Sequence, residues 1–99
     1  MTVDKGDDGR MTVAMSRSEN RMLVLTDNLP NPPEGKDFQV WTGHDGTMVS
    51  AGFLAPENGE ALLEISSIGD ADAIGVTLEP DGGSAEPTLP AVMEVPLPA

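Results

Sequence analysis

The fold class of this chain is indicated by the segment Asp37-Phe38-Gln39-Val40-Trp41-Thr42-Gly43-His44-Asp45-Gly46-Thr47-Met48-Val49-Ser50. In its first half, Phe38 and Val40 alternate with Gln39 and Trp41, which is the pattern of an extended strand with two different faces. The dipeptide Asp45-Gly46 follows, and Asp-Gly between two strand-like runs strongly favours a β-hairpin. We therefore predict antiparallel strands at residues 37–42 and 48–54.

Five further strand-like runs lie on either side of this hairpin, at residues 11–16, 22–26, 60–66, 72–78 and 91–95. The second of these is apolar on both sides, which predicts a central strand. The run 72–78 carries Ile74, Val76 and Leu78 on one side, which predicts a half-buried strand. Residues 60–66 also suit a helix by propensity, but a run of this length is short for an isolated helix. Together with the Gly, Pro, Asn and Asp clusters between the runs, the pattern predicts an all-β, immunoglobulin-like β-sandwich of about seven strands.

The length of the chain, 99 residues, leaves room for one compact domain. We expect a flexible N-terminal segment over residues 1–9, a single β-sandwich domain over residues 10–96 and a tail over residues 97–99. The longest apolar runs, residues 22–25 and 51–55, are far shorter than the ~18 residues that cross a bilayer. We therefore expect that the chain does not itself insert into a membrane.

The chain is strongly acidic, with 5 Lys and Arg against 17 Asp and Glu and a net charge of −12. Residues 51–99 hold nine of these acids and no Lys or Arg. Nucleic acids and anionic lipids are bound through clustered basic side chains, so we expect neither as a partner. The acidity suits solubility, and an acidic docking face for a basic partner is the alternative interpretation.

Residue types that carry out chemistry are sparse. The absence of cysteine excludes disulfides, thiolate metal sites and cysteine nucleophiles. His44 is the only histidine, and no nucleophile-elbow motif accompanies it, so we expect no enzymatic activity. A loose calcium loop at residues 4–9 lacks the ligand spacing of an EF-hand. A copper site made of methionines and His44 competes with the packing of those methionines in a β core, which we favour. We expect neither a metal nor a cofactor.

Five motifs follow one another between residues 29 and 88. They are Leu29-Pro30, Pro33-x-Gly35-Lys36, Phe38-Gln39-Val40-Trp41, Ser50-Ala51-Gly52-Phe53 and Val76-Thr77-Leu78-Glu79-Pro80-x-Gly82-Gly83-Ser84-x-x-Pro87-Thr88. In this order they resemble the extracytoplasmic C-terminal domain of the anti-sigma-K factor family. The last motif is long and specific, whereas the shorter ones would mean little alone. Phe38 departs from the Tyr usual in the family, and Thr42 from a commoner apolar residue.

The resemblance implies a regulatory or sensor domain on the outer side of a bacterial membrane, periplasmic or at the cell surface. In such a protein an N-terminal cytoplasmic domain, absent from this chain, binds an extracytoplasmic-function sigma factor, and a single membrane helix, also absent here, provides the anchor. Proteolysis of the anti-sigma factor then releases the sigma factor, so a protease or an envelope protein is an expected partner. The alternative is a stand-alone secreted or periplasmic β-sandwich that serves as a binding or adhesion module.

The residues that carry the resemblance have a structural interpretation of their own. We expect Trp41 in the sandwich core with its N–H bonded to backbone, and Gly52 at a bulge or a close backbone approach, under Trp41. We expect positive φ at Gly82 and Gly83, and a Glu79 carboxylate that accepts N–H groups from the following loop and so pins it. A docking site for a protease or partner is the alternative role of this segment. The complete set is Gln39, Trp41, Gly52, Phe53, Thr77, Glu79, Pro80, Gly82, Gly83, Ser84, Pro87 and Thr88.

Overall fold

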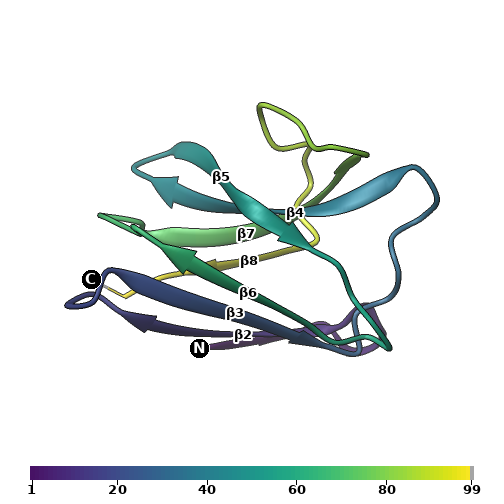
Figure 1. The fold of residues 1–99 in the computed structure, drawn as a ribbon, viewed down its shortest axis with the longest axis horizontal. Helices are drawn as coiled ribbons and strands as arrows, with labels where there is room; N and C mark the ends of the chain where they lie inside the picture. The colour runs from purple at the N-terminus through teal and green to yellow at the C-terminus, as the bar shows by residue number, and fades with distance from the viewer. Residues whose placement is uncertain (99) are drawn as a thin grey trace.

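The computed structural model describes residues 1–98 and is a sandwich of two antiparallel four-stranded sheets (Figure 1). The first sheet has the order β1-β2-β3-β6 and the second the order β5-β4-β7-β8. The strands are β1 (Thr2–Asp4), β2 (Arg10–Ser16), β3 (Arg21–Asp27), β4 (Lys36–His44), β5 (Thr47–Leu54), β6 (Ala61–Ser66), β7 (Ala73–Pro80) and β8 (Met93–Pro96). The predicted all-β sandwich is therefore confirmed.

All seven strands predicted from the sequence are present, and the segment 60–66 forms β6 rather than a helix. The β4–β5 hairpin turns at Asp45 and Gly46, whose φ angles are 53° and 89°. Positive φ at both central residues matches the twist of the two strands, which is why Asp-Gly is favoured there. None of the elements described is a helix that is long and apolar enough to span a bilayer.

Both ends of the chain contact the sandwich. Residues 1–9 were predicted to be a flexible segment, but they contain β1 and a 3-10 helix, η1 (Gly6–Asp8). The β1–β2 ladder and a hydrogen bond of 2.9 Å from the Met1 amino group to the Val13 carbonyl hold this segment on the sheet. Of the predicted tail, Leu97 is buried and its N–H donates to the Asp72 carbonyl, whereas residue 99 lies outside the described residues.

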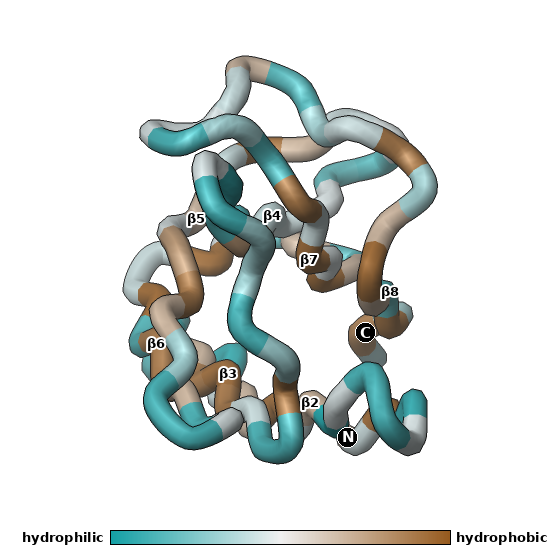
Figure 2. The backbone as a smooth tube through the Cα atoms, turned by 90° about the vertical axis from the view of Figure 1, so that its right-hand side faces the viewer, coloured by the Kyte–Doolittle hydropathy of each residue, from teal (hydrophilic) through white to brown (hydrophobic). Residues whose placement is uncertain are grey.

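The main core lies between the two sheets. Every second side chain of β2 and β3 points into this core. Figure 2 shows hydrophobic stretches along β3, β6, β7 and β8. The buried apolar residues are Met11, Val13, Met22, Val24, Leu29, Phe38, Val40, Leu54, Ile65, Ile68, Ala71, Ile74, Val76, Met93 and Leu97. Several methionines thus pack in this core, where their flexible side chains fill irregular space.

The inner strands of the second sheet, β4 and β7, are buried on both faces, and this differs from our expectation for β7. Ile74 and Val76 contribute to the main core, but Gly75, Thr77 and Glu79 on the opposite side of the strand are also buried. The prediction of a half-buried strand was therefore wrong. The residues that cover the second face come from the connection between β7 and β8.

Candidate functional site

The connection between β7 and β8, residues 81–92, crosses the outer face of the second sheet, and we call it the strap (Figure 1). Beneath it, the β4–β7 register pairs Gln39 with Thr77 and Asp37 with Glu79. The side chains of these four residues and the strap make polar contacts that are separate from the main core. Turn-forming residues are frequent in the strap sequence, so we predicted that Glu79 attaches this loop but not that the loop covers a face of the sheet.

Trp41 lies on this outer face, and not in the sandwich core as predicted. Its side chain is completely buried, yet it is absent from the core cluster that contains its neighbour Val40. Its partner in the ladder is Gly75, where an added Cβ would lie 3.5 Å from the Met48 Cε. The indole N–H donates to the Thr77 hydroxyl over 2.8 Å, so its partner is a side chain rather than the expected backbone carbonyl.

Glu79 is a fully buried carboxylate at the centre of the site. The Thr77 hydroxyl donates to Oε2, the Thr88 N–H donates to the same oxygen over 2.7 Å, and the Thr88 hydroxyl donates to Oε1 over 2.7 Å. Burial alone would raise the pKa of this carboxyl, but the hydrogen bonds from Thr77, Thr88 and Ser84 together lower it to about 2. The carboxylate does bind the strap, as we expected, although the donors come from Thr88 and not from the two glycines.

The Gln39 side chain holds the middle of the strap. Its Oε1 accepts the Ser84 N–H over 2.9 Å, and its Nε2 donates to the Ser84 carbonyl over 3.1 Å and to the Ser50 hydroxyl over 2.8 Å. A primary amide can pair with a backbone N–H and C=O in this way because it carries a donor and an acceptor side by side. Gln39 thus binds the strap as a neighbouring strand would.

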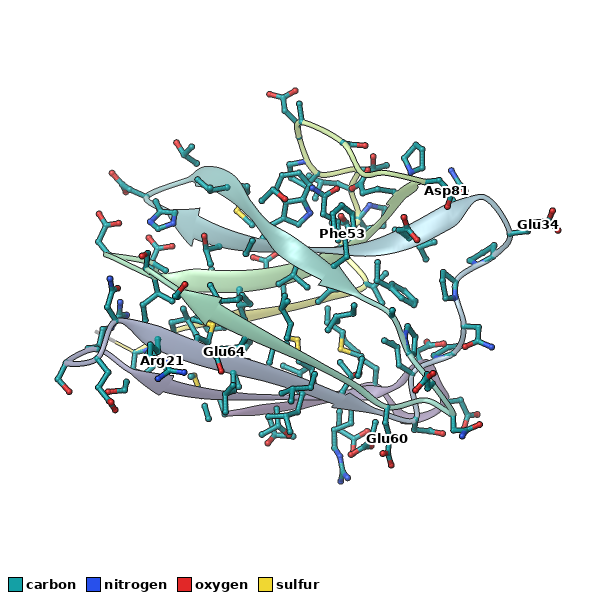
Figure 3. The ribbon with its side chains drawn as sticks, viewed as in Figure 1. Arg21, Glu34, Phe53, Glu60, Glu64 and Asp81 are labelled. Carbon is teal, nitrogen blue, oxygen red and sulfur yellow. The ribbon has the colours of Figure 1, made fainter. Side chains whose placement is uncertain are left out.

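The two glycines of the strap both have φ of 89°, as predicted, but they are not equivalent. A Cβ at Gly82 would meet nothing within 4 Å, whereas one at Gly83 would lie 2.7 Å from the Phe53 ring and 2.9 Å from Gln39 Oε1. The Gly82 N–H donates to the Asp37 carboxylate over 3.1 Å. Gly83 therefore allows the strap to approach the sheet closely beside Phe53, which is labelled together with Asp81 of the strap in Figure 3.

Gly52 marks a bulge, as predicted, because the β4–β5 register shifts between Val40 and Trp41 opposite this residue. Its φ of 144° favours glycine. The close approach at Gly52 is to Leu63 of β6, whose Cδ1 would lie 3.1 Å from an added Cβ, and not to Trp41 as we expected. Gly52 thus lies where the edges of the two sheets meet, outside the polar contacts of the strap.

The remaining predicted residues lie at the margins of the strap. Pro80 is the last residue of β7 and pairs with Lys36. Pro87 lines a shallow hollow with Met48 and the β4–β5 turn, so the strap reaches from Gln39 at one side of Trp41 to Met48 at the other. The structure brings the following predicted residues into the strap site: Gln39, Trp41, Phe53, Thr77, Glu79, Pro80, Gly82, Gly83, Ser84, Pro87 and Thr88.

Two further residues of the structure were not predicted: Asp37, which accepts the Gly82 N–H, and Arg17. The Arg17 guanidinium donates to the carbonyls of Gly69, Ala71 and Pro98 over 3.3, 2.9 and 2.6 Å, and so ties the C-terminal residues to the β6–β7 connection. Asp37 could have been found, because it lies two residues before Gln39 and therefore on the same strand face. Arg17 gave no such signal, since its acceptors are backbone carbonyls far away in sequence.

The polar side chains of the strap site hold the strap on the sheet, and His44 makes separate contacts at the other end of β4. His44 Nδ1 lies 2.6 Å from Asp70, whose pKa is lowered mainly by this hydrogen bond, and Nε2 lies 2.9 Å from the Thr42 hydroxyl. Across residues 1–98, no group of three or more His, Cys, Asp or Glu side chains is placed to hold a metal ion. The strap site can therefore make the position of the strap depend on the buried carboxylate of Glu79.

Comparisons with known proteins place this sandwich in a family. The model of the C-terminal domain of the anti-sigma-K factor RskA matches residues 1–93. The chain is 33% identical over 94 residues to the anti-sigma-K factor RskA of Mycolicibacterium vanbaalenii, covering 90% of this chain and 38% of that protein. It is 32% identical over 93 residues to the RskA of Mycobacterium tuberculosis, covering 90% of this chain and 40% of that protein.

A further relative is the uncharacterized protein in the phr 5′ region of Streptomyces griseus, 44% identical over 78 residues, which cover 78% of this chain and 33% of that protein. The chain thus spans 33 to 40% of the length of these relatives. No solved structure matches it. Because the family model covers nearly the whole sandwich, the chain belongs to the anti-sigma-K factor RskA C-terminal family.

Proposed function

We propose that this chain is the extracytoplasmic regulatory domain of a membrane-anchored anti-sigma factor that controls the release of an extracytoplasmic-function sigma factor. Membership of the RskA C-terminal family carries this proposal and gives the chain a regulatory role in an anti-sigma factor. The relatives extend well beyond the matched region, which leaves room for a sigma-binding domain and an anchor in the intact protein. Any contact with the sigma factor is made by that other domain and not by the β-sandwich.

The sandwich acts by limiting proteolysis. A protease needs an extended segment of chain, and a folded domain supplies one only when it opens locally or globally. The strap is suited to such control, because Gln39 and Glu79 fix it to the sheet while more than half of its residues are exposed. A signal that loosens the strap or removes a bound envelope protein would therefore increase cleavage of the anti-sigma factor and release the sigma factor.

The domain works as a regulator without catalysis, metal or cofactor of its own. Support for this comes from the family, whose named members are anti-sigma factors, and from the structural use of the polar residues in the strap site. The net charge of −12 disfavours nucleic acid and anionic lipid as partners. A stand-alone secreted or periplasmic adhesion module is the competing function, and the greater length of the relatives weighs against it.

The location is tested by fusing alkaline phosphatase, which is active only after export, to the C-terminus of the full-length gene product. We expect an active fusion, and an inactive one when the enzyme is placed before the first long apolar segment of that product. Deleting the sandwich in the full-length protein should change the activity of a sigma-dependent reporter. An inactive C-terminal fusion, or a mature protein that begins after a cleaved signal peptide, would contradict the proposal.

A further inference from the structure

The outer face of the first sheet carries exposed leucines. Met22 and Val24 of β3 point into the core, and the residues between them point outward, so that Leu23 is 37% and Leu25 41% exposed. Leu62 of β6 is 64% exposed and pairs with Leu25 in the ladder, which makes the two side chains neighbours. β3 is an inner strand of its sheet, as its apolar sequence predicted, but its outer face remains in contact with solvent. We call this surface the leucine face.

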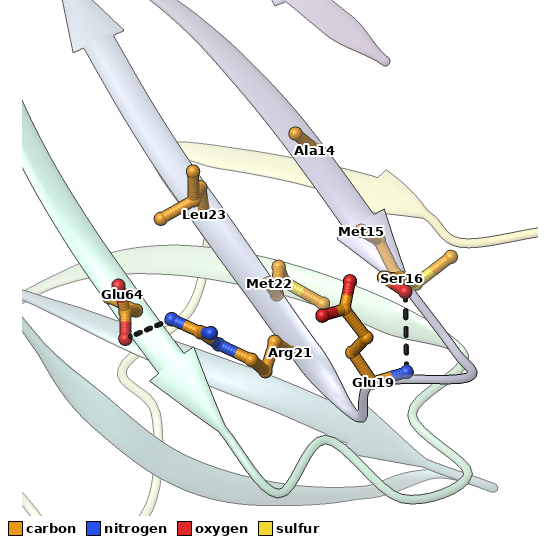
Figure 4. A pocket seen from close by; sticks show the side chains of 8 residues that line it. All are labelled: Ala14, Met15, Ser16, Glu19, Arg21, Met22, Leu23 and Glu64. Atoms are coloured by element: carbon orange, nitrogen blue, oxygen red, sulfur yellow. Dashed lines mark hydrogen bonds and ion pairs between the residues drawn. The ribbon is translucent and has the colours of Figure 1, made fainter.

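Two ion pairs flank the leucine face at the two ends of β3. Arg10 lies 2.6 Å from Asp27 at one end, and Arg21 lies 2.7 Å from Glu64 at the other. Figure 4 shows Leu23 between Ala14 of β2 and the Arg21–Glu64 pair. Both basic side chains of this surface are thus paired with acids, and the further acids Glu19, Glu57 and Glu60 lie at its margins.

The outward side chains of β3 would match those of a second β3 strand that runs in the opposite direction. Val24 is the centre of the strand; Leu23 and Leu25 lie one residue on either side of it, and Arg21 and Asp27 lie three residues away. A two-fold axis that lies between the two copies, perpendicular to β3 and level with Val24, would place Leu23 of one copy over Leu25 of the other. The same axis would place Arg21 over Asp27, and symmetry would form each contact twice.

We propose that the leucine face is a self-association surface on which a second copy of this chain docks, with the two β3 strands crossing in opposite directions. Sheets that pack face to face lie about 10 Å apart with their strands within about 30° of each other, which this arrangement allows. A four-stranded face of this size buries about 400 Å² per copy. This is below the ~800 Å² per partner of stable complexes, so the association is weak and reversible.

The net charge makes the salt dependence of this association distinctive. Two chains of −12 repel each other at long range, whereas the paired charges on the leucine face do not. Salt screens this repulsion between charges that lie farther apart than the Debye length, which is about 8 Å at physiological ionic strength. Self-association should therefore strengthen as salt is added. Binding of a basic partner to this acidic chain would weaken instead.

The 99-residue chain can be tested directly, by sedimentation equilibrium and by amide chemical shifts in NMR spectra recorded from micromolar to millimolar concentration. We expect a monomer–dimer equilibrium, stronger in high salt, with concentration-dependent shifts confined to β1, β2, β3 and β6. Leu25→Thr should weaken it by about tenfold or more, because a leucine is lost from the centre of both faces. Val49→Thr is the matched control, since Val49 is 48% exposed on β5 of the other sheet and lies outside the leucine face.

Charge reversal separates the proposed geometry from unspecific apolar contact. Arg21→Asp and Asp27→Arg should each weaken the dimer, because each places like charges opposite one another across the axis. The double variant R21D/D27R should restore it, although both intramolecular ion pairs of the face are then lost. Circular dichroism of each variant establishes that the sandwich is folded.

A chain that stays monomeric at millimolar concentration overturns the proposal. So does a dimer whose shifts lie on β5 or the strap, one that Leu25→Thr leaves unchanged, or one that weakens as salt is added. A double charge variant that is no better than the single variants overturns the antiparallel crossing of β3. None of these outcomes bears on the anti-sigma role, which does not depend on the association.

Discussion

The backbone N–H and the hydroxyl of Thr88 both donate to the carboxylate of Glu79, each over 2.7 Å. Nine residues separate the two in sequence, and the bonds close the strap over the sheet at its far end. The Thr77 hydroxyl links the same carboxylate to the indole N–H of Trp41. One ionised group therefore joins the strap, β7 and β4, and several measurable properties of the domain depend on it.

Replacing Glu79 by alanine should destabilise the domain by about 1–3 kcal/mol, because donors from Thr77 and Thr88 lose their buried acceptor. Urea denaturation followed by far-UV circular dichroism measures this change. Glu94→Ala is the matched control, since Glu94 is an exposed glutamate on β8 and should change stability little. An unchanged urea midpoint for Glu79→Ala would show that the strap does not depend on the carboxylate.

The stability of the domain should fall at low pH through Glu79. The pKa of this carboxyl is about 2 in the folded protein against an ordinary value of 4.5, so the unfolded state binds the proton first as the pH falls. The stabilisation, about 3 kcal/mol, is complete above pH 4.5 and is lost between about pH 4.5 and 2. Comparing urea melts of the wild type and Glu79→Gln across this window isolates it from the other carboxylates. Parallel pH profiles for the two proteins would contradict the assignment.

Alanine at the two strap glycines should have unequal effects. Both residues have φ of 89°, so each substitution costs about 1 kcal/mol or more of backbone strain. Gly83→Ala also forces its Cβ against Phe53 and Gln39, whereas Gly82→Ala meets open space. Urea melts should therefore rank Gly83→Ala as clearly less stable than Gly82→Ala. Equal losses for the two variants would mean that the strap does not approach the sheet at Gly83.

In the full-length protein, Glu79→Ala should increase the activity of a sigma-dependent reporter several-fold. A less stable outer domain populates open, cleavable states more often. Immunoblotting should show faster loss of the intact anti-sigma factor, while Glu94→Ala should leave both readouts unchanged. A domain that is destabilised in isolation but gives an unchanged reporter would reject control through stability, and would direct attention to a partner-binding surface instead.

Calcium and copper should not change the melting temperature of the domain. A ligand that binds only the folded state raises the melting temperature by mass action. In the N-terminal turn, the Asp4 carboxylate accepts the Gly6 N–H over 2.9 Å. A rise in melting temperature with either metal that a chelator reverses would contradict this prediction.

The strands could be predicted from the sequence because alternation and turn chemistry are local. Asp45-Gly46 sets the central hairpin through its backbone angles, and the alternation of Met11, Val13 and Met15 matches the inward face of β2. β1 was missed because Thr2-Val3-Asp4 is too short to show alternation and lies among aspartates and glycines. Its order comes from a ladder with β2, which is a property of the folded sheet.

The site could be predicted only in part, because alternation separates the two faces of a strand without saying what covers each. It placed Gln39 and Trp41 opposite Phe38 and Val40, as the structure has them. It gave no sign that the strap buries the second face, since a segment rich in glycine, proline and acidic residues is expected in solvent. Trp41 was therefore predicted to lie between the two sheets, whereas it lies on the outer face of the second sheet.

The position of Trp41 also gives the chain an intrinsic spectroscopic probe. The sequence contains one tryptophan and no tyrosine, so its ultraviolet fluorescence comes almost entirely from a single indole. That indole is buried on the strap side of the second sheet, apart from the main core. Its emission wavelength and its accessibility to a quencher therefore follow the lifting of the strap, while far-UV circular dichroism follows the strands. Local opening and global unfolding can thus be recorded separately in the unlabelled protein.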